Sequence, residues 1–136
     1  MKGFLLLADA ARAHPDGTFS LLRGGVDQVF SPRTQPFQFR GSVVARIMGD
    51  LSEAGAHDFQ LRILNEDGQA IVPEITGQFS IPDGGGVGVA IMDFALILPS
   101  YGRYTFALNV DKQKLDSWEV RASETPENQS QGGGQP

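Results

Sequence analysis

The chain has 136 residues, and its 16 Asp and Glu outnumber its 11 Lys and Arg, which gives a net charge of -5 at pH 7. This negative charge opposes nonspecific binding to nucleic acid or to anionic lipid, so we expect neither as a partner. The sequence contains no Cys, which excludes disulfides, thiolate metal sites and cysteine nucleophiles. A folded part of about 120 residues is long enough for one domain with a buried core.

The first apolar segment runs from Phe4 to Ala8 and precedes Ala11-Arg12-Ala13, which imitates a signal-peptide cleavage site. Asp9 limits the apolar run to about five residues, whereas a signal peptide needs roughly 7 to 15. We therefore interpret this segment as a buried first strand. No other apolar stretch approaches the roughly 18 residues of a membrane span, and the longest is interrupted by Asp93. We expect a soluble, cytoplasmic protein with no membrane partner.

Short strands follow one another, because turn signals separate runs rich in Phe, Val, Ile, Leu and Tyr about every eight to twelve residues. His14 to Gly17 predicts a turn between the first strand and a second one over Thr18 to Leu22. Arg23-Gly24-Gly25 then leads into a third strand over Val26 to Phe30. This order predicts a three-stranded meander.

The clearest alternation lies in two runs whose apolar residues occupy odd positions, with polar residues between them. The apolar members are Phe37, Phe39, Val43, Ala45 and Ile47 in the first run and Phe59, Leu61 and Ile63 in the second. If the two runs pair as antiparallel neighbours, Ala45 lies opposite Phe59, and Arg46 lies opposite Asp58 on the solvent side. A shift by one residue would pair core with solvent, so we expect this register.

The later strands are separated by equally clear turns. Asn65 to Gly68 predicts a turn, and Pro73 suggests an edge or a break before the strand Ile75 to Ile81. In the run Val87 to Leu98 the apolar residues change from odd to even positions, which predicts a bulge near Met92-Asp93. Two closing strands are expected near Tyr104 to Val110 and Leu115 to Ala122.

Together these elements predict an all-β fold: an antiparallel two-sheet β-sandwich of Greek-key or immunoglobulin type, with about eight or nine strands. Residues 1–122 are expected to form this single domain. Residues 123–136 contain polar side chains and glycines and offer nothing apolar to bury. Ordering them would cost entropy without compensation, so we predict a disordered polar tail.

Candidate catalytic residues are scarce. His14 and His57 are the only imidazoles, and neither has a second ligand at metal-binding spacing. Gly84 to Gly88 lacks the following helix and the Lys of a phosphate-binding loop, so a hairpin connection is favoured. We predict no catalytic residue, no cofactor and no metal ion. A Ser-His-Asp triad assembled from distant residues stays an open alternative, although no G-x-S-x-G elbow is present.

Three arginines suggest an interaction surface. Arg40, Arg46 and Arg62 occupy polar positions of the two alternating runs, so they are expected to share one solvent face. Such a face can receive carboxylates or a phosphate from a partner. The alternative is an ordinary solvated surface, with cross-strand pairing to Asp58.

Three segments resemble a family of small uncharacterised bacterial all-β proteins, a domain of unknown function. They are Phe4-Leu5-Leu6-Leu7-Ala8-Asp9-Ala10-Ala11, Gly24-Gly25-Val26-Asp27 and Pro99-Ser100-Tyr101-Gly102-Arg103-Tyr104-Thr105-Phe106. The resemblance covers residues 3 to 121. It implies a β-sandwich with no assigned catalytic residues, so it supports the fold and leaves the activity open.

Two hypotheses for the function remain. The first is a non-enzymatic binding or assembly module, in which an unpaired edge or the arginine face meets a protein partner or a second copy of the chain. The alternative is a small-molecule-binding protein or an enzyme. Its pocket would be formed by the loops at Arg23 to Asp27 and Pro82 to Gly86, with Arg23 and Asp27 as the polar groups.

Overall fold

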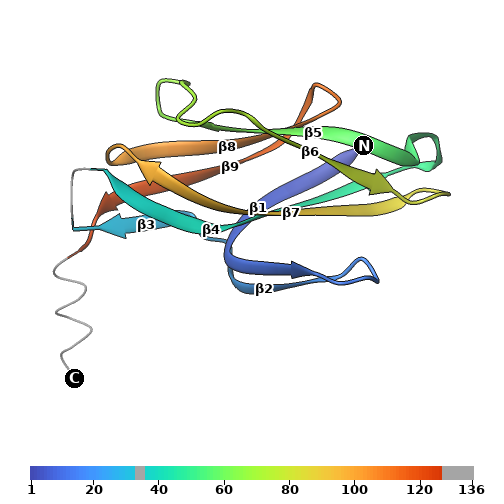
Figure 1. Ribbon diagram of the computed structural model, residues 1–136, viewed down its shortest axis with the longest axis horizontal. Helices are drawn as coiled ribbons and strands as arrows, with labels where there is room; N and C mark the ends of the chain where they lie inside the picture. Colours follow the sequence, from blue (N-terminus) through green and yellow to red (C-terminus); the bar gives the residue numbers. More distant parts are fainter. Residues whose placement is uncertain (33–35, 127–136) are drawn as a thin grey trace.

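The computed structural model describes residues 1–32 and 36–126. In this part of the chain nine strands form two sheets (Figure 1), and no α-helix is present, so the predicted all-β class is confirmed. Sheet A has the strand order β2-β1-β4-β7, and sheet B has the order β3-β9-β8-β5-β6. The strands are β1 (Lys2–Ala13), β2 (Phe19–Gly24), β3 (Gln28–Ser31), β4 (Phe37–Gly49), β5 (Gly55–Leu64), β6 (Ile75–Ile81), β7 (Gly86–Leu98), β8 (Gly102–Val110) and β9 (Gln113–Glu124), and one 3-10 turn, η1, spans Leu51–Glu53.

Sheet A is antiparallel throughout, whereas sheet B is mixed because β3 runs parallel to β9. The prediction of antiparallel pairing alone was therefore wrong at β3. After β2 the backbone N–H groups of Gly25 and Val26 donate to the carbonyl of Leu7, and the chain then crosses to sheet B. The predicted three-stranded meander is thus a two-stranded hairpin of β1 and β2, followed by a strand in the other sheet.

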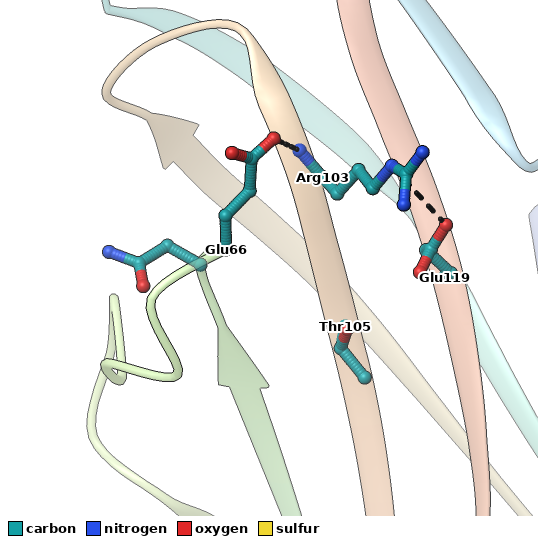
Figure 2. A pocket seen from close by; sticks show the side chains of 5 residues that line it. Glu66, Arg103, Thr105 and Glu119 are labelled. Carbon is teal, nitrogen blue, oxygen red and sulfur yellow. Dashed lines mark hydrogen bonds and ion pairs between the residues drawn. The ribbon is translucent and has the colours of Figure 1, made fainter.

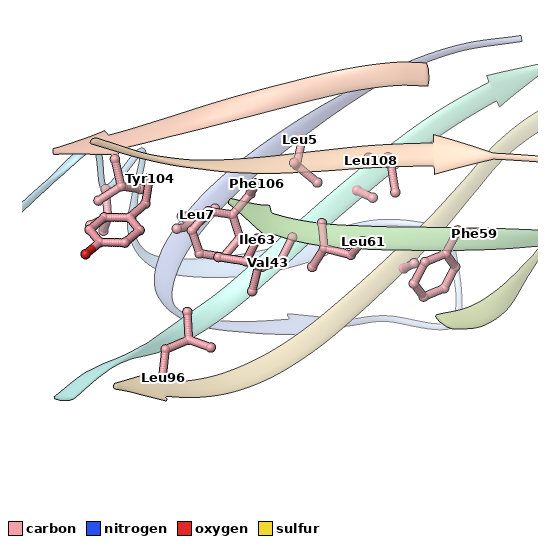
Figure 3. Packing of buried hydrophobic residues seen from close by; sticks show 14 of the residues in the cluster. Leu5, Leu7, Val43, Phe59, Leu61, Ile63, Leu96, Tyr104, Phe106 and Leu108 are labelled. Atoms are coloured by element: carbon pink, nitrogen blue, oxygen red, sulfur yellow. The ribbon is translucent and has the colours of Figure 1, made fainter. Parts of the chain in front are cut away.

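The core lies between the two sheets and contains side chains from both, including Leu5, Val43, Leu61 and Phe106 (Figure 3). The inward positions predicted for β4 and β5 are confirmed, because Val43 and Leu61 are both buried. These strands lie in different sheets, however, so the predicted pairing of Ala45 with Phe59 was wrong. Alternation shows which side of a strand is buried, but two apolar rows can meet across a core as well as side by side.

Strand β7 pairs with β4 in a continuous register from Gly49 opposite Gly86 to Phe37 opposite Leu98. The predicted bulge near Met92-Asp93 was therefore wrong. The even positions of β7 face the core, and its odd positions lie on the opposite side of sheet A. The apolar residues at odd positions therefore lie on the outer side of sheet A, and they are not a continuation of the row of β7 residues that faces the core.

The irregularity of the fold lies in β9, where Leu115 is an extra residue between Lys114, opposite Asn109, and Asp116, opposite Leu108. Carboxylate oxygen Oδ2 of Asp116 accepts a hydrogen bond of 2.7 Å from the backbone N–H of Leu5. Strand β1 pairs with β2 only from Ala8 onward, so this N–H has no strand beside it. The bulged strand of sheet B therefore supplies the acceptor that a neighbouring strand would have provided.

Three aromatic side chains tie the connections between the sheets to the strands. The hydroxyl groups of Tyr104 and Tyr101 each donate a hydrogen bond of 2.7 Å to a backbone carbonyl, that of Ser100 and that of Ser31. Trp118 Nε1 donates to the carbonyl of Val26 at 2.8 Å. These bonds fix the β7–β8 connection and the segment that crosses from β2 to β3.

The ordered chain continues past the predicted domain limit at residue 122. β9 extends to Glu124, and the backbone N–H of Thr125 donates to the carbonyl of Ser31 at 3.1 Å. The predicted tail from 127 to 136 lies outside the described residues. No helix in the described residues is long and apolar enough to cross a membrane.

Candidate functional site

A polar hollow of about 470 Å³ lies on the outer side of sheet B, where the Asn65 to Gly68 turn meets β8 and β9 (Figure 2). Its lining residues are Asn65, Glu66, Arg103, Thr105 and Glu119. Glu66 Oε1 accepts a hydrogen bond of 2.9 Å from the backbone N–H of Arg103. Arg103 Nε lies 3.9 Å from Glu119 Oε1, at the limit of an ion pair, and both side chains are more than half exposed. An exposed pair of this length contributes little stability.

This hollow depends on Gly102, which begins β8 with a positive φ of 142°. A Cβ at this position would lie 3.0 Å from Glu66 Oε1, so a larger residue would displace the carboxylate from the backbone of Arg103. The hollow thus has a defined geometry. It is nevertheless open and polar, whereas small-molecule sites are mostly enclosed and apolar with a few convergent polar groups.

A second hollow of about 240 Å³ is lined by Arg23, Gly24, Gly25, Val26, Asp27, Gln28 and Phe30. It contains both polar residues of the predicted loop pocket. The guanidinium of Arg23 is already engaged, because Nε and Nη2 donate to the two carboxylate oxygens of Asp9 at 2.6 and 2.9 Å. This bidentate contact lowers the pKa of Asp9 and raises that of Arg23.

The second loop of the predicted pocket is elsewhere. The turn Pro82 to Gly86 does not line the hollow at Arg23 and Asp27. Gly85 lies against the backbone of Gly49 to Leu51, close enough that a Cβ would lie 3.0 Å from the Asp50 carbonyl carbon. The two loops that the alternative hypothesis combined are therefore not brought together.

The three arginines are divided between the two sheets. Arg40 and Arg46 lie on β4 in sheet A, whereas Arg62 lies on β5 in sheet B. All three occupy outward positions, so Arg62 points outward on the opposite side of the molecule from the other two. Asp58, the predicted partner of Arg46, instead accepts a hydrogen bond of 2.8 Å from Gln78 Nε2 within sheet B.

Of the two histidines, His57 has the more defined surroundings. Its Nδ1 lies 2.6 Å from Asp111 Oδ2, its Nε2 lies 2.6 Å from the carbonyl of Glu53, and its ring stacks on Phe79. Two acceptors favour a proton on both ring nitrogens, so the contacts with Glu53 and Asp111 raise the pKa of His57 above its usual value of 6.5. His57 links η1 to the β8–β9 turn, which is a structural role.

The surface that sequence analysis missed is the outer side of sheet A, which we call the outer face. Its cross-strand neighbours form successive rows through β1, β4 and β7. The first four rows, each with one residue from β1, β4 and β7, are Lys2, Met48 and Val87; Phe4, Arg46 and Val89; Leu6, Val44 and Ile91; and Ala8, Ser42 and Asp93. Two further rows contain residues of β4 and β7: Arg40 and Ala95, then Gln38 and Ile97. The apolar part is concentrated in the first three rows.

A sequence signal for this face existed. Leu5-Leu6-Leu7 and Val43-Val44 are apolar at consecutive positions, and strands that bury only one side alternate instead. Val44 is fully buried, yet it lies between its cross-strand neighbours Leu6 and Ile91 and outside the core between the sheets. Consecutive apolar residues therefore indicated that sheet A is apolar on both sides.

Comparison with known proteins gives a family and no activity. A model described as a family of unknown function (DUF6941) matches residues 3–123. This range includes the whole stretch, residues 3 to 121, over which the sequence resembles an uncharacterised family. No curated protein matches the chain.

Proposed function

The chain belongs to this family of unknown function, and from its structure we propose that it is a non-enzymatic binding or assembly module that meets a protein partner. The contact surface that we assign is the outer face of sheet A. The observation that carries the proposal is the contrast between the outer sides of the two sheets, because that of sheet A has three mainly apolar rows and that of sheet B is polar.

The outer face exposes large apolar side chains that a solvated sheet would replace with polar ones. Within the first three rows Phe4 is 38% exposed and Met48 51%; Ile97, which is 59% exposed, lies apart from them at the far end of the face. The corresponding side of sheet B carries polar residues, among them Asp58, Gln60, Arg62, Thr76, Gln78, Arg103, Thr105, Asn109, Glu119 and Arg121. Contiguous apolar surface of this kind, bordered by polar residues, is typical of protein interaction sites.

For the fold we infer a sandwich of Greek-key, immunoglobulin-like type. The hydroxyl of Tyr104 bonds to the carbonyl four residues upstream, which is the geometry of the tyrosine corner in such domains. Hairpins join β1 to β2, β5 to β6 and β8 to β9 within a sheet, and every other connection passes from one sheet to the other. Sandwiches of this kind commonly serve as scaffolds that present one sheet face or a set of loops.

Site-specific photocrosslinking tests the proposal. A photoreactive phenylalanine analogue replaces Val89 on the outer face in one variant, and Thr105 on the outer side of sheet B in the control. Both positions are half-buried and point away from the core. We expect a discrete protein adduct from the Val89 variant, identified by mass spectrometry, and none from the control. Adducts from Thr105 alone, or from neither position, contradict the proposal.

The second candidate is a small-molecule site at the hollow that contains Arg23 and Asp27. The observation in its favour is that both predicted polar residues line the same hollow, beside the partly exposed ring of Phe30. The volume of about 240 Å³ is below the roughly 300 Å³ at which ligand pockets usually begin. Because Arg23 is also engaged by Asp9, the structure favours the outer face.

A further inference from the structure

We propose that the partner on the outer face is a second copy of this chain, related by a two-fold axis that crosses the strands at the row of Leu6, Val44 and Ile91. This inference rests on the proposed function and specifies its partner. It is carried by the distribution of charge on either side of that apolar row.

The rows next to the central one have opposite charges. On one side lies the row of Phe4, Arg46 and Val89, with a guanidinium on β4. On the other side lies the row of Ala8, Ser42 and Asp93, with a carboxylate on β7. An apolar centre between a cation and an anion is complementary to the same pattern turned end for end. The reversal also brings Lys2 of the first row near Arg40 in the fifth row of the other copy, but both side chains are exposed at the edge of the contact, so solvent and salt screen this repulsion.

A two-fold axis that lies in the interface and perpendicular to the strands produces this reversal. It places β4 of one copy against β4 of the other in the opposite direction, so Arg46 of each copy lies over Ser42 of its partner. Asp93 is the cross-strand neighbour of Ser42, about 5 Å away laterally. Each dimer therefore has two equivalent contacts between Arg46 and Asp93, as an isologous interface requires.

The charge pattern also excludes the other simple arrangement. An axis parallel to the strands along β4 would leave the row order unchanged and place Arg46 of one copy against Arg46 of the other. Like charges in contact are repulsive, and the apolar surroundings would strengthen this repulsion. The pattern therefore favours the antiparallel order, in which like charges approach each other only at the edge of the contact.

Both charged groups are available for such a contact. Ser42 Oγ donates a hydrogen bond of 2.6 Å to Asp93 Oδ1, and Ser42 is buried, so the carboxylate is held in place before a partner arrives. In the described part of the chain no other hydrogen bond reaches the carboxylate of Asp93, and Arg46 takes part in no ion pair. A carboxylate held in this way loses little entropy on binding.

The size of the face predicts a weak affinity. An axis at the row of Leu6, Val44 and Ile91 brings equal numbers of rows into contact on either side of it. Three strands about 4.8 Å apart and the three rows from Phe4 to Ala8, about 6.8 Å apart, cover roughly 300 Å² of each copy in projection, or about 600 Å² for the pair, which is below the standard size of specific interfaces. The hairpin of β1 and β2 lies on the side of sheet A away from sheet B, and its Leu22 is 67% exposed (Figure 1). Contact with this hairpin adds apolar area, and we expect a dissociation constant on the order of 10 µM.

Charge exchange tests the geometry. The full chain is studied by sedimentation velocity from about 1 to about 500 µM, a range that brackets the expected constant. We expect wild type to dimerise, and Arg46→Asp and Asp93→Arg each to weaken dimerisation at least about tenfold, because each places like charges in both contacts. An equimolar mixture of the two variants should recover a dimer. One contact then joins the two substituted positions, whose charges are opposite, and the other joins the native Arg46 and Asp93.

The control is Arg62→Asp, which removes an exposed arginine from the outer side of sheet B and should leave dimerisation unchanged. Recovery in the mixture also shows that both variants are folded. A wild type that stays monomeric to about 500 µM overturns the inference, as does a mixture that stays monomeric when wild type dimerises. If wild type is monomeric while position 89 crosslinks to a different protein, the proposed function stands and only the identity of the partner is wrong. If position 89 gives no adduct either, both proposals fail.

Discussion

Replacing Asp116 with Ala should destabilise the fold at the junction between the two sheets. Asp116 Oδ2 accepts the 2.7 Å hydrogen bond from the backbone N–H of Leu5, a residue that is only 2% exposed. Removing the carboxylate leaves a buried donor without an acceptor, and hydrogen bonds to charged groups contribute about 1.5 to 3 kcal/mol. We expect the free energy of unfolding to fall by about 2 kcal/mol, which for a domain of this size lowers the melting temperature by about 8 °C.

The control for this substitution is Asp116→Asn, whose amide oxygen can still accept from the Leu5 N–H. We expect Asn to cost less than about 1 kcal/mol, because the acceptor stays and only its charge is lost. Urea unfolding measures both changes, and amide exchange locates them. With Ala, the Leu5 amide should exchange about 30-fold faster by local opening. A change in stability below about 0.5 kcal/mol with Ala, or unaltered exchange at Leu5, would refute the assignment of this side chain as a substitute for a strand.

Three further predictions concern single contacts. The protonated His57 lies between two acceptors and its folded pKa is raised above 6.5, so its stabilisation is complete below that pH and is lost as pH rises through the folded value. The urea midpoint of His57→Gln should therefore fall furthest below that of wild type near pH 5.5 and approach it near pH 9; a gap that widens with pH would contradict this sign. Gly77→Ala would place a Cβ 2.5 Å from the ring of Phe59, and we expect calorimetry to show a loss of about 1 to 3 kcal/mol; an unchanged melting temperature would mean that the ring moves freely. Tyr104→Phe removes the hydroxyl that donates at 2.7 Å and should cost about 1 kcal/mol in urea unfolding, whereas a stabilised variant would show that this bond contributes nothing.

The sequence was sufficient to predict the strands and, for most of them, which side is buried. The odd positions of β4 and β5 are buried as expected, because alternation follows directly from the pleat of a strand. Pairing could not be derived in the same way. Val43 and Leu61 belong to rows that meet across the core, and nothing local distinguishes that arrangement from two neighbouring strands. The parallel placement of β3 depends on contacts with β9, which is about 90 residues away in sequence.

The candidate sites were predicted less well, for related reasons. Arg40 and Arg46 share a strand and therefore a face, whereas Arg62 was grouped with them only through the incorrect pairing of β4 with β5. Arg23 and Asp27 line one hollow because they are close in sequence. The outer face was missed because the change from odd positions at Val87, Val89 and Ile91 to even positions later in the strand was attributed to a bulge. Only the register with β4 shows that these residues point away from the core.

The central claim is that the outer face of sheet A is where this protein meets a second copy of itself, and a concentration series of amide spectra of the isotope-labelled chain tests it most directly. We expect the signals of Leu6, Val44 and Val89 to shift progressively as the concentration rises from about 10 to about 500 µM. The signals of Arg62 and Thr105 on the other sheet should stay unchanged. Shifts confined to sheet B, with none on the outer face, would contradict the account.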